Sequence, residues 1–207
     1  MRRLIYVPIV HTAADMGSQA EALEREHVRR HGRGEWARTR RLIDEVWEGL
    51  RTRLLALNLD YRRVRIYQDG LPVCGRELDI VREVAQGGSR NYALILELLS
   101  RGAVVEGTES PGLLREEYER IRSAIPAGQA REEHAREGER ILRQRDEFIG
   151  RRIDETLKEG EVGILFIGLM HRVDRFLAPD IEVQYLIHRL PFQIPPGDPG
   201  PRTRHGG

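Results

Sequence analysis

The most apolar stretch of the chain lies at residues 162–170, between the turn Lys158-Glu-Gly160 and the polar group that begins at His171. Its sequence is Val-Gly-Ile-Leu-Phe-Ile-Gly-Leu-Met. A continuous apolar run of this length is typical of a strand buried on both faces, as the central strands of parallel sheets are. We therefore expect a central strand here and arrange the other elements around it.

Four shorter segments also have strand patterns, through apolar runs or through alternation: residues 4–10, 63–68, 103–105 and 181–187. Pro8 in the first segment suits an edge strand or a bulge near the strand end. Helical spacing predicts helices over residues 18–55, with a break at 31–34, and over 77–85, 92–99, 110–125 and 130–158. The alternation predicts a layered α/β fold: a mainly parallel sheet of about five strands is flanked by helices, and one long charged helix precedes the penultimate strand.

The chain is organised as one domain with a tail. Its 207 residues suit a single core, so we predict one α/β domain over residues 1–190. Residues 191–207 are rich in proline and glycine, which is typical of a disordered tail. The helix predicted over 130–158 would be about 40 Å long, long enough for a homodimer contact.

Composition narrows the range of partners and locations. The chain carries 34 basic and 33 acidic residues, a net charge of +1. Because a nucleic-acid or membrane-surface binder needs a clustered basic excess, we expect neither partner. A single cysteine, Cys74, excludes an intramolecular disulfide and a cysteine-cluster metal site. The N-terminal apolar run is too short for a membrane span, and we expect a cytoplasmic protein.

Candidate chemistry gathers where the predicted strands end. In chain order, the polar residues at these ends are His11 and Asp15, then Asp69, then Glu106 and Glu109, then His171, Arg172 and Asp174. If the strands are parallel, these residues meet at one edge of the sheet, where α/β proteins bind ligands. Two imidazoles with carboxylates suit a divalent metal such as Zn, Mn, Co or Fe.

Residue type suggests a role for each candidate. His11 and His171 are the predicted metal ligands. A carboxylate outside the ligand set can act as general base on water, so the predicted catalytic residues are Asp69, Glu106 and Glu109. Substrate binding is assigned to nearby polar residues: Asp15, Arg90, Arg172 and Asp174.

Each candidate also has an ordinary structural interpretation. Asp69 precedes Gly70 and suits a turn. Glu106 and Glu109 lie near a predicted helix start, where carboxylates interact well with the helix dipole. A histidine after a strand commonly caps a backbone carbonyl. The hypothesis of a site therefore depends on the joint pattern and on the strands being parallel.

Two short motifs resemble those of a known superfamily. Gly168-Leu-Met-His171 ends the late apolar strand, and Pro8-Ile-Val-His11 stands at the same place on the first strand. Paired Gly-x-x-His motifs with intervening glutamates resemble the TraB/TIKI group, which has erythromycin-esterase-like and ChaN-like relatives. Pro8 departs from this pattern, because glycine is expected there.

The resemblance implies an α/β fold with both motifs on one face. For the TIKI branch it implies metal-dependent hydrolysis of peptide bonds. It implies His11 and His171 as metal ligands, with Glu106 or Glu109 as ligand or base.

Three functional hypotheses follow. The leading one is a metal-dependent hydrolase that acts on a small-molecule or peptide substrate at the strand ends. The second is a non-enzymatic module that binds an anionic small molecule or nucleotide near Arg90, Arg172 and Arg175. The third is an oligomeric interaction protein that assembles through the apolar face of the helix over residues 130–158.

Overall fold

The structure, a computed structural model, describes residues 1–9, 20–123 and 129–187. Five strands form one all-parallel sheet in the order β3-β2-β4-β1-β5. The strands are β1 (Arg2–Ile9), β2 (Val64–Gln68), β3 (Val104–Glu106), β4 (Val162–Gly168) and β5 (Ile181–Tyr185). The predicted α/β class is confirmed. The predicted tail over residues 191–207 lies outside the described residues.

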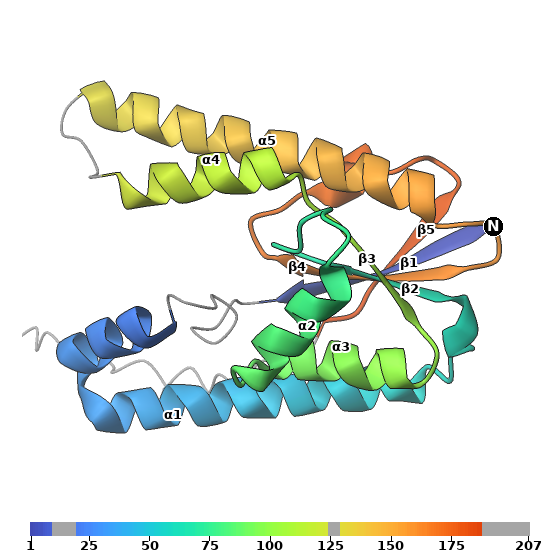
Figure 1. The fold of residues 1–207 in the computed structure, drawn as a ribbon, viewed down its shortest axis with the longest axis horizontal. Coiled ribbons are helices and arrows are strands. Elements are labelled where there is room, and N and C mark those ends of the chain that lie inside the picture. The colour runs from blue at the N-terminus through green and yellow to red at the C-terminus, as the bar shows by residue number, and fades with distance from the viewer. Residues whose placement is uncertain (10–19, 124–128, 188–207) are drawn as a thin grey trace, which may run out of the picture.

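Helices cover both faces of the sheet (Figure 1). One face carries α1 (Ala20–Ala56), α2 (Glu77–Gln86) and α3 (Arg90–Ser100), and the other carries α4 (Pro111–Arg122) and α5 (Gln129–Thr156). Short 3-10 helices precede two strands: η2 (Tyr61–Arg63) and η3 (Val173–Phe176). The long charged helix before the penultimate strand is α5. Within the described residues, no helix is both long and apolar enough to cross a bilayer.

The central strand β4 divides the core into two clusters. Ile164 and Phe166 point to the face covered by α1, where Phe166 meets Trp47. Leu165 and Ile167 point to the opposite face and join a separate cluster with residues of α5. All four strand side chains are fully buried, which confirms the central strand, but the strand ends at Gly168, and Leu169 and Met170 of the apolar run are exposed. Each such burial contributes roughly 1.5–3 kcal/mol to stability.

Of the two alternatives for Pro8, the edge strand is wrong, because β1 lies between β4 and β5. Pairing with β5 ends at Tyr6, whose carbonyl accepts from the N–H of Leu186 at 2.9 Å. Pro8 lies beyond this pairing, so its missing N–H costs no bond to β5. The sheet therefore keeps a proline in an interior strand, near the strand end.

The break predicted at residues 31–34 is a kink in α1. Gly32 has φ 85° and ψ 161°, in the left-handed half of backbone space that glycine reaches without strain. The two parts of α1 therefore differ in direction, as the blue helix of Figure 1 shows.

A close contact joins α5 to η3, the element that follows the end of β4. A Cβ added at Gly150 would lie 2.7 Å from the carbonyl oxygen of Phe176 and 2.9 Å from its Cβ. Only glycine therefore allows α5 to approach the segment after His171 this closely.

We predict that Gly150→Ala lowers the free energy of unfolding by about 1–3 kcal/mol, because α5 must move away from η3. Gly112→Ala on α4 is the control, since its nearest neighbour would be Ser110 Oγ at 3.7 Å. That control is expected to be neutral or slightly stabilising, because alanine favours a helix. Urea unfolding measures both, and equal effects would contradict the packing argument.

Candidate functional site

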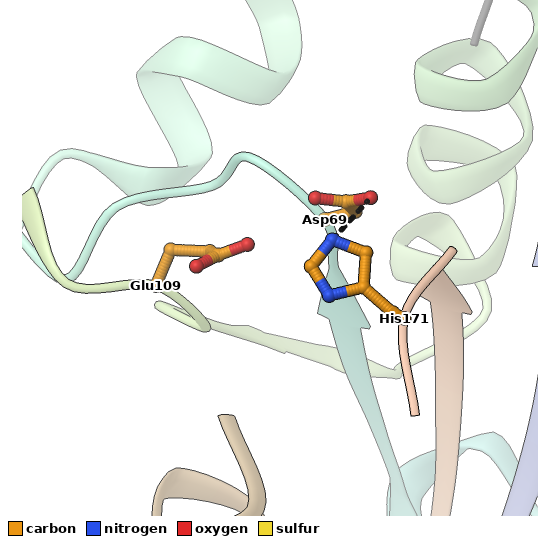
Figure 2. A group of neighbouring side chains, drawn as sticks. All are labelled: Asp69, Glu109 and His171. Atoms are coloured by element: carbon orange, nitrogen blue, oxygen red, sulfur yellow. Dashed lines mark ion pairs between the residues drawn. The ribbon is translucent and has the colours of Figure 1, made fainter. Parts of the chain in front are cut away.

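Three of the predicted residues meet at the carboxyl edge of the sheet. Asp69 directly follows β2, Glu109 follows β3, and His171 follows β4. Figure 2 shows their side chains pointing toward one another, and a ligand atom of each lies within 4.8 Å of the others. Their side chains are 4%, 0% and 5% exposed, so the group is shielded from water.

Backbone hydrogen bonds hold the two carboxylates in place. The carbonyl of Leu71 accepts from the N–H groups of Thr108 at 2.9 Å and Glu109 at 3.0 Å. These bonds tie the loop after β2 to the loop after β3. The N–H of Gly168 donates to Asp69 Oδ2 at 2.9 Å, which joins Asp69 to the end of β4. Three neighbouring strand ends are thus locked together around the site.

Asp146 of α5 orients the histidine. Its Oδ1 lies 2.5 Å from Nδ1 of His171, and its Oδ2 accepts from the N–H of Arg172 at 2.9 Å. Because a carboxylate accepts, Nδ1 carries the hydrogen and Nε2 faces the cluster, 3.5 Å from Asp69 Oδ2. A carboxylate behind one ring nitrogen is typical of metal-bound histidines and also of acid–base histidines.

A buried guanidinium bridges the two carboxylates of the cluster. Nη2 of Arg145 donates to Asp69 Oδ1 at 2.7 Å and to Glu109 Oε1 at 2.5 Å, and its Nε donates to Glu109 Oε2 at 3.1 Å. Nη1 donates to Glu117 of α4. The side chain of Arg145 therefore connects α5 to the loop after β2, to the loop after β3 and to α4.

The buried charges do not balance. Asp69, Glu109 and Asp146 are buried carboxylates, whereas Arg145 is the buried guanidinium, and it contacts Asp69 and Glu109 but not Asp146, which contacts His171. Burial raises the pKa of Glu109 above its ordinary value and outweighs the opposing effect of Arg145. Burial alone would lower the pKa of Arg145, but Glu109 and Asp69 more than offset this and raise it. The arginine stays charged, and the excess of negative charge favours uptake of a proton or a cation.

Glu106 does not join this cluster. Its carboxylate pairs with Arg65 of β2 and lies 3.9 Å from Arg152 of α5. Glu161 also pairs with Arg65, at 2.6 Å. Glu106 therefore belongs to a separate ion-pair network on the same face of the sheet, and the structure leaves Glu109 as the glutamate of the site.

The predicted substrate-binding residues are dispersed. Arg90 is exposed and pairs with Asp44 of α1 at 2.8 Å. Arg172 contributes its backbone N–H to Asp146, while its side chain is exposed. Asp174 is exposed at the start of η3 and helps to raise the pKa of Tyr6, which burial chiefly raises.

His11 and Asp15 lie outside the described residues. β1 ends at Ile9, which is paired with Gly168 at the end of β4. The metal-ligand role of His11 and the substrate-binding role of Asp15 stay predictions.

Sequence reasoning missed Arg145 and Asp146, because they lie within a helix and follow no strand. A pattern was nevertheless present. Arg145 is four residues after Ile141 and four before Ile149, both buried, so it falls on the apolar stripe of α5. A charged residue on such a stripe requires buried partners of opposite charge.

Comparisons with known proteins do not identify the chain: no family model, curated protein or solved structure matches it. The interpretation of the site therefore depends on its geometry. The resemblance to the TraB/TIKI group stays an expectation.

We predict that Arg145→Met lowers the free energy of unfolding by about 3–5 kcal/mol at neutral pH, because it leaves buried carboxylates unpaired. Arg143→Met is the control on the same helix; Arg143 is exposed and pairs with Glu147. An exposed pair contributes at most about 1 kcal/mol. Urea unfolding of both variants measures the difference. A loss in Arg145→Met as small as that in Arg143→Met would contradict the argument that the buried carboxylates need the charge of Arg145.

The raised pKa of Glu109 predicts a pH dependence of stability. Because its pKa is higher in the folded chain than in the unfolded chain, its contribution is greatest at low pH and is lost as pH rises through the folded value. Glu109→Gln cannot lose a proton, although it faces the same Asp69, Arg145 and His171.

Relative to wild type, Glu109→Gln should therefore become more stable as pH rises above the ordinary pKa of a glutamate. Urea unfolding at several pH values measures this difference. A difference that stays constant or changes in the opposite direction would contradict the raised pKa.

Proposed function

We propose that the protein is a divalent-metal-dependent hydrolase whose metal is held by Asp69, Glu109 and His171. One observation carries the proposal: a buried excess of carboxylates faces Nε2 of a histidine that Asp146 orients. A bound cation would cancel the excess charge and accept the lone pair of the imidazole.

The donor set suits such a cation. Both oxygens of Glu109 and Oδ1 of Asp69 accept from Arg145, but an ionised carboxylate has about four lone-pair sites, so acceptor capacity remains. One imidazole with two carboxylates fits Zn, Mn, Co or Fe. His11 is the predicted further ligand.

When bound, a divalent cation supplies the Lewis acidity that makes hydrolysis accessible at neutral pH. The residues of the chain have separate tasks. Asp146 fixes the ring of His171, and Arg145 fixes the carboxylate of Glu109. Glu109 is the third ligand, and because burial raises its pKa, it takes up a proton in the metal-free site more readily than an ordinary glutamate does. For the TIKI branch, the resemblance implies hydrolysis of peptide bonds.

The first test is calorimetric titration of the metal-free protein with Zn²⁺ and with Mn²⁺. We expect near-stoichiometric binding of at least one ion, weakened about 10-fold or more by His171→Ala, by Asp69→Asn and, through loss of orientation, by Asp146→Asn. His134→Ala is the matched histidine control. Its ring contacts Arg120, outside the site.

Glu106→Gln is the matched glutamate control for Glu109→Gln, since Glu106 pairs with Arg65 instead. Both control variants should bind metal like the wild type. A wild-type protein that binds neither ion, or a His171→Ala variant of unchanged affinity, would overturn the metal site. Hydrolysis is then tested with the metal-loaded protein on ester and peptide substrates, with Glu109→Gln expected to be inactive and Glu106→Gln active.

The other two hypotheses have less support at this edge of the sheet. The cluster has an excess of negative charge, and Arg90 pairs with Asp44, so an anionic ligand finds little attraction there. Ile149 of α5 packs in the core of its own chain. A homodimer through α5 stays a prediction.

A further inference from the structure

A second charged feature lies on α1, and unlike the buried cluster it is exposed and basic. Residues 33–41 contain four exposed arginines and a single acidic residue, Glu35. The arginines are Arg33, Arg38, Arg40 and Arg41, which we call the arginine stripe. In the part of the chain that the structure describes, no carboxylate pairs with any of the four.

The arginine stripe occupies one side of the helix. At 100° per residue its members fall within about 160° of one another, over a length of about 12 Å. The other side carries Ile43, Trp47 and Leu50, which pack on the core. Within residues 33–41 only Gly34 and Ala37 share this side of the helix with the arginines, whereas Glu35, Trp36 and Thr39 fall outside it.

Charged residues further along the same helix form ion pairs with neighbouring side chains. Asp44 pairs with Arg90 at 2.8 Å, and Arg51 pairs with Glu97 at 2.6 Å and with Glu48 at 3.3 Å. These local ion pairs lie on the outer face of the second half of α1. Among the described residues, no such pair involves the arginine stripe, although the chain as a whole is nearly neutral.

We propose that the arginine stripe binds the phosphate backbone of a nucleic acid. A duplex carries one negative charge for about every 1.7 Å of its axis, so several phosphates lie within the length of the stripe. Guanidinium groups bind phosphate oxygens in a bidentate manner. A single small phosphate would contact only part of the stripe, and a bilayer would need apolar side chains that this side of α1 lacks.

This proposal concerns one surface, whereas the expectation of no nucleic-acid partner considered the charge of the whole chain. The stripe lies in the half of α1 that extends beyond the carboxyl ends of the strands, as α4 and α5 also do (Figure 1). The proposal does not depend on the metal site, because the stripe shares no residue with it.

The test is fluorescence anisotropy of the full-length protein with a labelled duplex DNA and a labelled single-stranded RNA. The test variant replaces Arg33, Arg38, Arg40 and Arg41 by glutamine. We expect it to bind at least one probe about 10-fold or more weakly, with the slope of log affinity against log salt concentration reduced by about 3. Circular dichroism and thermal unfolding confirm that the variant is folded.

The matched control removes the same number of charges elsewhere: Arg62, Arg63, Arg115 and Arg131 to glutamine, all exposed and without ion pairs in the described residues. Its affinity should stay within about 3-fold of wild type. If both variants lost the same affinity, the effect would come from the net charge of the protein and not from the arginine stripe, and the proposal would be overturned. Wild-type protein that binds neither probe, or binds polyglutamate or anionic vesicles as tightly as nucleic acid, would also overturn it.

Discussion

The buried guanidinium of Arg145 is the interaction on which the site depends. It contacts Asp69 after β2, Glu109 after β3 and Glu117 on α4. Moving such ions out of water costs several kcal/mol each, and their attraction recovers this only when hydrogen bonds satisfy the remaining groups. Apolar side chains of similar volume would commonly serve stability as well or better. The cluster is therefore better explained by a function than by stability.

The fold supplies the rigidity that this cluster needs. β2 lies between β3 and β4, so Asp69 has the loop that carries Glu109 on one side and the segment that carries His171 on the other. α5 crosses the same face and adds the residue that orients the histidine. The three residues thus follow neighbouring strands of one sheet, and hydrogen bonds join the segments that carry them.

Much of this arrangement could be predicted from the sequence. The apolar run of β4 required a central strand, and parallel strands required their polar ends to meet, which brought Asp69, Glu109 and His171 together. The choice between Glu106 and Glu109 could not be made, because it depends on Arg65 of the neighbouring strand and on the bonds of one loop to Leu71. Strand order, which decides such neighbours, is not encoded in any local pattern.

The two site residues on α5 could not be predicted from the strand ends, for a different reason. Arg145 and Asp146 enter the site because α5 passes over the strand ends, and the path of a helix across a sheet is a tertiary property. Only the charge within an apolar stripe pointed to them. The roles of His11 and Asp15 stay predictions, and so does the cytoplasmic location.

The sequence separation of the site residues has a kinetic consequence. Arg145 is 76 residues from Asp69 and 36 from Glu109, and Asp146 is 25 from His171. Such contacts form only after long loops have closed, and parallel sheets are slow to assemble. We expect the charged groups to keep their hydration until late in folding. Interactions formed after the rate-limiting step act on the rate of unfolding, so the cluster would govern how long the native state persists rather than how quickly it is reached.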